Sequence, residues 1–518
     1  MDRCKSPEIL VFIILFVSLN FLMLPILIVP GSPMSMCVFL VLLSMAIAFD
    51  LSELFAAALV DEHDLPKLDC LSEYPSLAAL YLVCDDLVLV ALSRLRKLAY
   101  PRSDVFILDD SIDPTTKRLL DDTGFRIIRR QNRIGYKAGS LNNWLWLYGN
   151  HYKYFLVLDS DSIIPEGFAE SIVKYAEHPA NGRVAIFNSL SECWNTQIPF
   201  PRFLSLLTPL QNWIRTRLDN RCHSIFSTGH NNLHRSEAII EVGGFDENFI
   251  AEDIATTLRL VRVGYTSRLV NLVAYEAEPE HIFSYVRRIV RWAKQTIQIH
   301  RANWQGIPLS IKFRMFRLTW MYISFFLYPL WAILAAWGTS SSLSDVHVLI
   351  AAVAHGEISL LSVLTPFAII ITVPLIFLVP KIPLLVRFNI PISNYLGSCL
   401  LSLSIAFYSM LHVCFAQIAS ATNTTLTFDI TDKRSRPTSF LLIICHHWQL
   451  IPFWLFLAVG FWQNPISLFF SSLWVLVLVL APLIICLFHG TKLSNIYHTC
   501  PELTSRSAGG SCREKLAR

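Results

Sequence analysis

The sequence predicts an α/β domain with a mostly parallel, Rossmann-like sheet that is inserted between two groups of transmembrane helices. Three observations lead to this fold class. Hydrophobic residues make up 53% of the 518 residues and charged residues only 16%, whereas about 25% of the residues of an average soluble protein are charged. Apolar runs of membrane length lie at both ends of the chain. Between them, a polar middle section alternates β-rich and helical segments.

Two apolar runs, near residues 9–30 and 35–59, open the chain. Each contains the roughly 20 apolar residues that a helix needs to cross a bilayer. The first run is too long for the core of a signal peptide and lacks a cleavage site of small residues. We therefore predict that residues 1–60 form two transmembrane helices and that the first is not removed.

The polar section from residue 61 to 280 is predicted to carry the chemistry. Its β-rich segments lie at 80–84, 105–108, 155–158 and 184–188, and its helical stretches at 86–98, 115–122, 141–148 and 169–178. This β-α-β order is typical of a parallel sheet, whose ligands bind beyond the carboxyl ends of the strands. Asp113 precedes Pro114, as a helix-capping residue would.

Residues 281–314 are expected to lie at the membrane surface. The segment from 281 to 300 mixes Arg and Lys with Ile, Val and Trp at helical spacing, as an interfacial amphipathic helix does. Such a helix could form the floor of a site in the polar domain.

Five further apolar runs follow within residues 315–490, near 315–337, 357–380, 394–417, 440–462 and 465–488. Basic residues in the loop 427–437 and in the tail 491–518, which is predicted to be flexible, place both on the cytosolic side by the positive-inside rule. The run 394–417 is therefore expected to lie along the interface, which leaves four crossings after the domain. Seven crossings in all, the alternative, would expose the glycosylation sequon at Asn423 outside the cell.

Charge and cysteine content disfavour several classes of protein. The net charge of +4 is spread along the chain without a long basic run, so nucleic acid is not expected as a partner. The 12 cysteines form no C-x-x-C pair, which indicates reduced, structural thiols. A transporter with a soluble regulatory domain would also combine apolar runs with a polar section. It is disfavoured, because the apolar runs contain almost none of the charges that would line a transport path.

Asp159 and Asp161 directly follow an apolar strand, so we expect both carboxylates to point into one pocket. There they could hold Mg²⁺ or Mn²⁺ against a diphosphate. A D-x-D triplet also occurs by chance in solvated turns. Its position after the apolar segment, and between the other polar motifs, favours the metal site.

Carboxylates also end two earlier strands. Asp85 or Asp86, and Asp110, could accept hydrogen bonds from a uracil imide or a ribose hydroxyl. Helix capping is the alternative, because Asp86 begins a helical stretch; ligand binding is favoured for Asp110, and the two explanations are balanced for Asp85. Lys137 precedes another predicted helix start and could bind phosphate with its ammonium group.

Glu252 and Asp253 precede a helix rich in Thr, Leu and Arg, where acids also complement the helix dipole. Inverting sugar transfer needs a base that takes the proton of the attacking hydroxyl, and a partly desolvated Asp is suited to this. We predict that Asp253 is this base and that Glu252 assists it. Gly229, His230 and Asn231 could bind the growing sugar end, or form a hairpin turn.

Arg288, Arg291 and Trp292 form the pattern R-x-x-R-W. The two guanidinium groups share one helical face at i and i+3, which suits a pyrophosphate, and the indole beside them can stack on a sugar ring. Arginines that face lipid phosphates at the membrane surface are the alternative.

In this order and between these apolar runs, the motifs resemble the processive family-2 glycosyltransferases, above all bacterial cellulose synthases, over about residues 60–490. The resemblance implies a GT-A fold and a polysaccharide that leaves through the membrane helices. It also implies one role for each motif: Asp85 or Asp86 and Asp110 on the nucleotide, Asp159 and Asp161 on the diphosphate and metal, Gly229, His230 and Asn231 on the acceptor, Asp253 as the base, Arg291 on the pyrophosphate and Trp292 under the acceptor sugar.

A second likeness lies near the end of the chain. Phe428, Thr431 and Lys433 belong to a segment similar to the F-x-V-T-x-K gating loop of cellulose synthases, which closes over the donor from the cytosol. This likeness implies that residues 427–437 are cytosolic, in agreement with the interfacial position expected for 394–417.

Two departures from the family pattern leave the product open. Arg288 replaces the family's Gln, as in osmoregulated-periplasmic-glucan synthases, and Ala251 stands where cellulose synthases have Thr. Regulation by cyclic di-GMP within this chain is not expected. The predicted function is an inverting, Mg²⁺- or Mn²⁺-dependent synthase that builds a β-glucan from a UDP-sugar, most readily UDP-glucose.

The alternatives are a chitin- or hyaluronan-type synthase and a non-processive transferase of one sugar to a lipid phosphate. The expected partners are the UDP-sugar donor, the growing polysaccharide and the lipid bilayer. An accessory subunit outside the membrane could receive the chain.

Overall fold

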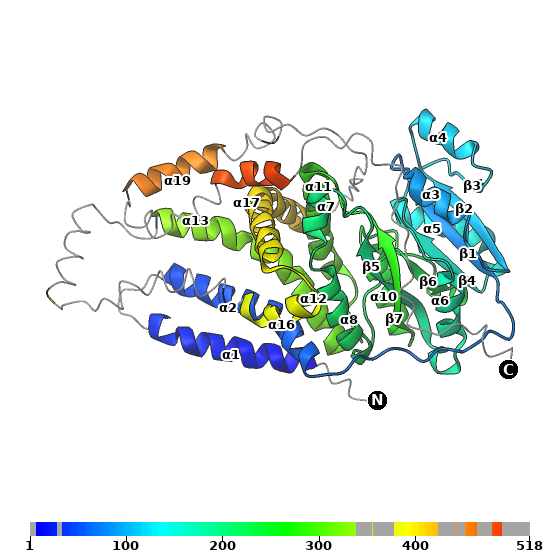
Figure 1. Ribbon diagram of the computed structural model, residues 1–518, viewed down its shortest axis with the longest axis horizontal. Helices are drawn as coiled ribbons and strands as arrows, with labels where there is room; N and C mark the ends of the chain where they lie inside the picture. Colours follow the sequence, from blue (N-terminus) through cyan, green and yellow to red (C-terminus); the bar gives the residue numbers. More distant parts are fainter. Residues whose placement is uncertain are drawn as a thin grey trace.

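The computed structural model describes residues 7–27, 34–337, 378–422, 451–463 and 479–488, together with the single positions 355, 375 and 443. Its centre is a seven-stranded sheet in the order β3-β2-β1-β4-β6-β5-β7 (Figure 1). Six strands point the same way, and β6 runs antiparallel between β4 and β5. The predicted α/β fold with a mostly parallel sheet is therefore confirmed. The strands are β1 (Leu77–Val83), β2 (Ser103–Asp109), β3 (Arg126–Ile128), β4 (Tyr154–Leu158), β5 (Val184–Cys193), β6 (Asn232–Arg235) and β7 (Thr266–Glu276).

Helices cover both faces of the sheet, because successive residues of a strand point to opposite sides. On one face, Ala78 and Leu80 of β1 pack with Trp144 of α5 and with α9. On the other face, Ala79 and Tyr81 pack against α3 and α4, and α6 continues this layer beside β4. With both faces buried, β1 and β4 are apolar along their length, and the polar groups next to them follow the strand ends. The helices of this domain are α3 (Leu89–Leu95), α4 (Pro114–Asp121), α5 (Tyr136–Tyr148), α6 (Phe168–Glu177), α7 (Pro199–Leu204), α8 (Thr208–Leu218), α9 (Ser236–Glu241) and α10 (Glu252–Arg262).

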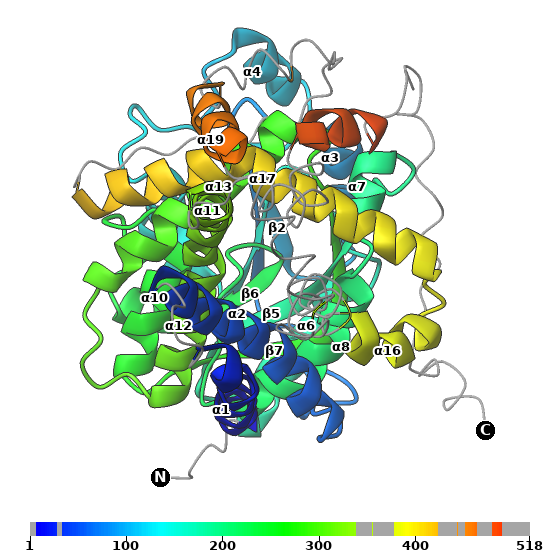
Figure 2. The ribbon, with the colours of Figure 1, turned by 90° about the vertical axis from the view of Figure 1, so that its left-hand side faces the viewer.

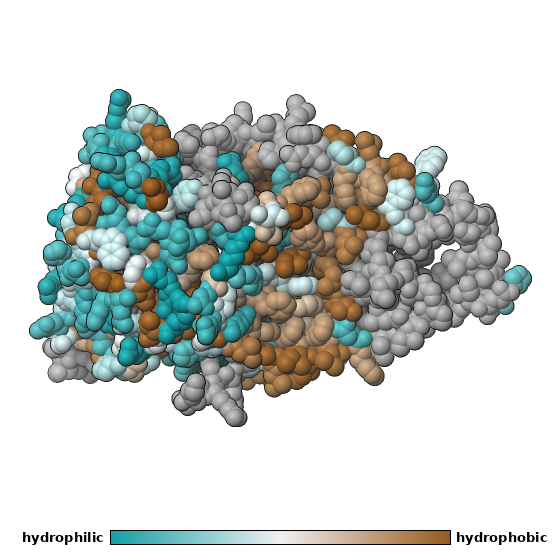
Figure 3. Space-filling model, turned by 180° about the vertical axis from the view of Figure 1, so that it is seen from behind, coloured by the Kyte–Doolittle hydropathy of each residue, from teal (hydrophilic) through white to brown (hydrophobic). Residues whose placement is uncertain are grey.

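Apolar helices project from one side of this domain (Figure 1), and their surface is mainly hydrophobic where the domain's own surface is polar (Figure 3). Among the described residues, Val41–Ala58 and Ile392–Thr422 are long and apolar enough to cross a membrane, and Pro7–Phe21, Ile451–Gln463 and Val479–Phe488 are shorter apolar helices. The helices on this side are α1 (Pro7–Leu27), α2 (Met34–Ala58), α11 (Ile282–Gln298), α12 (Leu309–Ile323), α13 (Leu327–Trp337), α16 (Ile382–Arg387), α17 (Ile392–Thr422) and α19 (Ile451–Gln463).

Helix α17 contains the run 394–417 that was expected to lie along the membrane interface. In Figure 2, α13 is seen end-on while α17 runs across the whole width of the molecule. The two helices are thus oriented roughly crosswise, as an interfacial and a membrane-crossing helix would be. The number of crossings stays a prediction, since much of the stretch between 338 and 450 lies outside the described residues.

Buried charges join the first two helices to the rest of the protein. Arg314 of α12 donates to Asp219 at 2.6 Å and to Glu8, at the start of α1, at 3.4 Å. Arg317, one turn further along α12, pairs with Glu53 near the end of α2 at 2.6 Å. The start of α1 and the end of α2 therefore meet the same helix, which is the geometry of a hairpin that leaves the domain and returns to it.

The predicted strands correspond to β1, β2, β4 and β5, whereas β3, β6 and β7 were not predicted. Two helix starts were placed wrongly. The helix predicted from residue 86 begins at Leu89, because Asp85 has a positive φ of 59° and the Asp86 carboxylate accepts from the Cys84 N–H at 2.8 Å, which forms a turn. The helix predicted from 141 begins at Tyr136, directly after Gly135 at φ 71°.

Candidate active site

A cavity of about 840 Å³ opens beyond the carboxyl ends of β1, β2 and β4. It brings together residues that are distant in the sequence and that were predicted to act together. Asp85 and Asn231 do not line it, and Phe428, Thr431 and Lys433 lie outside the described residues. The predicted residues that line it are Asp86, Asp110, Lys137, Asp159, Asp161, Gly229, His230, Glu252, Asp253, Arg288, Arg291 and Trp292.

The two neighbouring carboxylates after β1 have different surroundings. Asp85 accepts from the N–H groups of Ile112 and Asp113, at 2.9 Å and 2.8 Å, and its own N–H donates to Ser111. It therefore fixes the loop that follows β2. Asp86 lines the cavity, and its carboxylate accepts from the Ser160 hydroxyl at 2.8 Å. Of the pair left open by the sequence, Asp86 is the one placed to meet a ligand.

Asp110 lines the cavity while both of its carboxylate oxygens are bound by Arg130, at 2.8 Å and 2.6 Å. The same guanidinium also donates to the carbonyl of Tyr136 in the first turn of α5. A bidentate pair of this kind holds its members in one geometry. Asp110 therefore ties the end of β2 to the start of α5, as well as facing the cavity.

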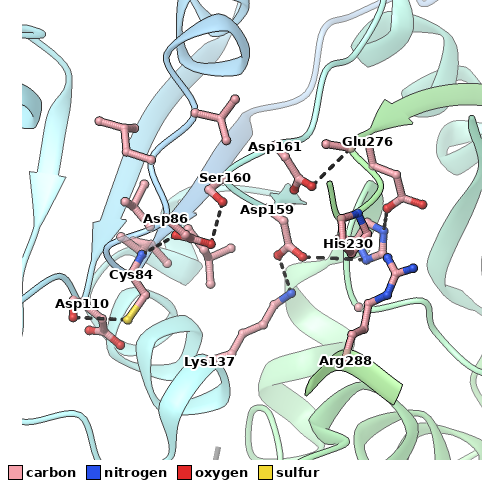
Figure 4. A pocket seen from close by; sticks show the side chains of 18 of the residues that line it. Cys84, Asp86, Asp110, Lys137, Asp159, Ser160, Asp161, His230, Glu276 and Arg288 are labelled. Carbon is pink, nitrogen blue, oxygen red and sulfur yellow. Dashed lines mark hydrogen bonds and ion pairs between the residues drawn. The ribbon is translucent and has the colours of Figure 1, made fainter. Parts of the chain in front are cut away.

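Asp159 lies at the centre of the cavity (Figure 4). Its Oδ1 accepts from the Lys137 ammonium at 2.7 Å, and its Oδ2 lies 4.0 Å from Nδ1 of His230. Although burial favours the neutral amine, the carboxylates of Asp159 and Glu252 hold the pKa of Lys137 above its usual value. Lys137 is therefore a fixed positive charge in the middle of the cavity.

Asp161 is held from the other side of the cavity. Its Oδ2 accepts from the backbone N–H of Ala277 at 3.3 Å, and its carbonyl accepts from the indole of Trp194 at 3.0 Å. The carboxylates of Asp159 and Asp161 thus face the same space from one tight turn after β4, as the D-x-D pattern predicted.

His230 follows Gly229 in the loop that leads into β6. Its Nε2 pairs with the carboxylate of Glu276. Burial works against the charged ring, but Glu276 and Asp159 raise the pKa of His230 to about 9, so the imidazole is a cation at neutral pH. Asn231, at φ 55°, is buried and donates its N–H to Val157 at 2.7 Å. The segment enters a central strand, so it is not a hairpin turn.

Glu252 and Asp253 occupy the first turn of α10 and both line the cavity. Burial, and then the neighbouring Asp253, raise the pKa of Glu252 to about 8. Burial also raises the pKa of Asp253, which the hydrogen bond from the Ile254 N–H and the charges of Lys137 and His230 oppose. Glu252 is therefore mostly protonated at neutral pH and can donate a hydrogen bond. The Asp253 carboxylate can accept a proton, and its raised pKa makes it a stronger base than an exposed Asp.

Helix α11 forms the floor of the cavity. Its apolar face, with Val286, Ile289 and Ala293, packs against α17, and its polar face carries Arg288 and Arg291 towards the cavity. Trp292 on the same side is 38% exposed. The arginines face the cavity, so the arrangement favours a ligand over lipid phosphates as their partner.

Several residues that line the cavity were not predicted from the sequence. Trp194 and Asn195 follow β5, and Arg133 and Tyr136 flank the loop before α5. Three glutamates at alternate positions, Glu276, Glu278 and Glu280, line it at the end of β7. Acidic residues at every second position after an apolar strand are the same pattern that predicted Asp159 and Asp161. The same pattern could have predicted these three glutamates.

The cavity has two chemically different ends (Figure 4). Cys84, Asp86 and Asp110 lie on one side, His230, Glu276 and Arg288 on the other, and Asp159 and Lys137 between them. Among the residues that the structure describes, no group of three or more His, Cys, Asp or Glu side chains is arranged to hold a metal ion. A metal at Asp159 and Asp161 would therefore need further ligands from its substrate.

Comparison with known proteins relates the chain to enzymes that handle sugars. Residues 154–379 match the family described as "Glycosyl transferase family group 2". The chain is 27% identical over 236 residues to cellulose synthase 1 catalytic subunit of Komagataeibacter xylinus, and this match covers 44% of the chain and 31% of that protein.

Two further relatives are glucans biosynthesis glucosyltransferase H of Caulobacter vibrioides, 27% identical over 262 residues, and glucomannan 4-beta-mannosyltransferase 2 of Arabidopsis thaliana, 25% identical over 248 residues. These matches cover 44% of the chain in each case, and 37% and 45% of the relatives. The chain thus spans less than half of the length of the relatives it matches.

Among solved structures, a mannosyltransferase from Pyrobaculum calidifontis in complex with GDP-Man and Mn²⁺ is similar, with a TM-score of 0.44 and 18% identity. The match covers 66% of this chain and 98% of that one.

Proposed function

We propose that the chain is a membrane-bound, inverting β-glycan synthase of the family-2 glycosyltransferases. The match of residues 154–379 to that family, and the relation to cellulose synthase, glucan glucosyltransferase H and glucomannan mannosyltransferase, support this. The protein polymerises the sugar of a UDP-sugar, with UDP-glucose as the first donor to test, and passes the polymer through its apolar helices. The observation that carries this proposal is the meeting of Asp161, Asp253 and Trp292 in one cavity.

The nucleotide end of the cavity is the end with Cys84, Asp86 and Asp110, where Arg133 donates to the sulfur of Cys84. Carboxylate and guanidinium groups there can bind the hydroxyl and imide groups of a uridine. The diphosphate then lies in the middle, where Lys137 and Arg291 supply positive charge to the leaving group.

Asp159 and Asp161 fit Mg²⁺ or Mn²⁺, because both ions favour carboxylate oxygens and commonly bind to one or two carboxylates together with substrate phosphates. Such an ion would supply further neutralisation of the charge that develops on the diphosphate. The remaining steps of the transfer depend on the side chains of this protein.

Asp253 acts on the acceptor. Its carboxylate takes the proton of the acceptor hydroxyl as the hydroxyl oxygen bonds to the anomeric carbon of the donor sugar. On the opposite face of that carbon, the bond to the diphosphate oxygen breaks and UDP leaves, so the configuration inverts. Protonated Glu252 beside it can hold the attacking hydroxyl by a hydrogen bond without competing for its proton.

Trp292 and the end of the cavity with His230 and Glu276 receive the acceptor. An indole face stacks on a pyranose ring and keeps the terminal hydroxyl near Asp253 after each addition. The polymer would leave past α11 and the apolar helices. By this proposal the domain is cytosolic and the helices span the cell membrane, with residues 394–417 along its inner surface.

The proposal is tested with isolated membranes, Mg²⁺ or Mn²⁺ and radiolabelled UDP-glucose, UDP-N-acetylglucosamine or UDP-glucuronate. One donor should give a polymer that linkage-specific hydrolases digest. Asp253→Asn should abolish incorporation and leave UDP binding nearly unchanged. A labelled lipid that carries a single sugar, with no polymer from any donor, would instead identify a non-processive transferase to a lipid phosphate.

A further inference from the structure

We propose that Arg288 and Glu278 form a positioning pair that orients the indole of Trp292 for the acceptor sugar. The inference rests on the proposed function, because it assumes that Trp292 carries an acceptor. It assigns to Arg288 a role different from that of Arg291. Arg288 orients the Trp292 indole, whereas Arg291 binds the diphosphate.

Arg288 contacts the side chains of Glu278, Tyr285 and Trp292. Its Nη2 pairs with the carboxylate of Glu278. Its guanidinium carbon lies 4.9 Å from the ring centre of Trp292 and 5.0 Å from that of Tyr285. Tyr285 precedes Arg288 by three residues on α11 and Trp292 follows it by four, so the guanidinium lies between the two rings along one helical face.

Glu278 is itself held by the end of β5. The side-chain amide of Asn195 accepts from the backbone N–H of Glu278 at 3.0 Å and donates to its carbonyl at 2.9 Å. The neighbouring Trp194 donates its indole N–H to the carbonyl of Asp161 at 3.0 Å. The two consecutive residues thus connect the turn that carries Asp161 to the segment that carries Glu278, and through Arg288 to Trp292.

This arrangement explains why Arg stands at a position where the resembling family has Gln. A guanidinium that is paired with a carboxylate and packed on an indole is restricted in orientation, because the ion pair and the ring contact together fix where its plane lies. A Gln side chain has neither the charge nor the ring contact. The pair Arg288–Glu278 is therefore a feature of this chain that fixes the tilt of the indole.

The test measures transfer to an added oligosaccharide primer, using whichever UDP-sugar wild-type protein incorporates. Glu278→Gln removes the ion pair but keeps the Asn195 clamp, which contacts only the backbone of Glu278. The KM for the primer should rise about tenfold, while the KM for the donor and the slow hydrolysis of donor without primer stay within about twofold. Hydrolysis of the donor also shows that the variant is folded.

Further variants sharpen the result. Arg288→Lys keeps the charge and loses the planar group, so it should raise the primer KM nearly as much as Glu278→Gln. Combining Glu278→Gln with Arg288→Gln should raise the primer KM little further than Arg288→Gln alone, because the two residues act as one pair. Glu177→Gln is the matched control, since Glu177 pairs with Lys153 at the opposite end of the sheet, at 2.7 Å, and should leave both KM values unchanged.

A rise of the donor KM equal to that of the primer KM would overturn the inference and make Arg288 a ligand of the diphosphate. Unchanged kinetics in Glu278→Gln and Arg288→Lys would overturn it as well. If wild-type protein incorporates no sugar from any donor, the proposed function fails first, which is a different outcome from either of these.

Discussion

Replacing Gly229 by Ala is expected to slow transfer by displacing the proposed base. Gly229 has a positive φ of 79°, and a Cβ at this position would lie 2.8 Å from Oδ2 of Asp253 and 3.4 Å from its Cβ and Cγ. Ordinary contacts of a Cβ begin at 3.4 Å, so the carboxylate must move by about 0.6 Å. Rotation of the carboxylate alone cannot relieve this, because Oδ1 is held by the N–H of Ile254 at 2.8 Å.

Displacement of a reacting group by about 1 Å costs roughly 100-fold in rate. A shift of about 0.6 Å should therefore lower kcat roughly 10- to 100-fold, with little change in the KM for the donor. The measurement is the initial rate of incorporation from the radiolabelled UDP-sugar at saturating donor.

Gly167→Ala is the matched control for this change. Gly167 has nearly the same φ, 76°, but a Cβ there would meet nothing within 4 Å. Both variants should lose a similar ~1 kcal/mol of stability from the left-handed backbone, which thermal unfolding can verify. If Gly229→Ala turned over as fast as Gly167→Ala, the contact with Asp253 would have no bearing on catalysis, and the assignment of the base would fail.

Three further predictions concern the carboxylates and the junction with the membrane helices. Because burial raises the pKa of Asp253 and transfer needs its ionised form, the rate should fall as the pH drops through that raised pKa. Glu252 is neutral in that pH range, so Glu252→Gln should leave this fall where it is and instead remove the decline expected as Glu252 ionises near its pKa of about 8; a pH–rate profile identical to that of wild type would contradict the role proposed for Glu252. Chelation by EDTA should abolish transfer. Asp161→Asn should raise the Mn²⁺ concentration needed for half-maximal rate by roughly tenfold or more, because loss of even an outer-shell partner lowers metal affinity by about that factor. If wild type and Asp161→Asn needed the same Mn²⁺ concentration, Asp161 would not be a metal ligand. Arg314→Ala removes the cation paired with buried Glu8 and one of the two cations paired with buried Asp219, which keeps Arg215, and should cost about 3–5 kcal/mol of stability, seen as a lower melting temperature in detergent; a melting temperature equal to that of wild type would refute this.

The strands that could be predicted are those whose residues are apolar on both faces. β1, β2 and β4 are short apolar runs that end in a carboxylate, so both their position and their polar end are visible in the sequence. β6 reads Asn-Leu-His-Arg, and its buried Asn232 and His234 conceal it, because buried polar side chains look like a loop until their partners are known. In β7 the alternation is broken by irregular register against β5.

The site could be predicted residue by residue where one motif follows one strand, but the pairings within it could not. A positive φ at Asp85 decides which of two adjacent carboxylates enters the cavity, and neither residue type indicates it. The partner of Asp110 is Arg130, 20 residues away, and that of His230 is Glu276, 46 residues away. Such pairs depend on the order of the strands in the sheet. This order differs from the order of the motifs in the chain, because the antiparallel β6 lies between β4 and β5.

The position of α11 makes the site depend on the membrane-facing half of the protein. Val286 and Ile289 on one face of this helix pack with Ile405 of α17, while Arg291 and Trp292 on the other face line the cavity. A helix is stiff over one turn, so any tilt that α17 imposes on the apolar face moves the indole by a similar amount. The domain from residue 61 to 280 therefore contains the donor side and the proposed base, but lacks Arg291, one of the two cations proposed for the leaving diphosphate, and Trp292, the ring proposed to stack on the acceptor sugar. A polymer that leaves among the apolar helices, as proposed, would pass beside the helix that aligns its next acceptor hydroxyl, and export and elongation would then share one structural element.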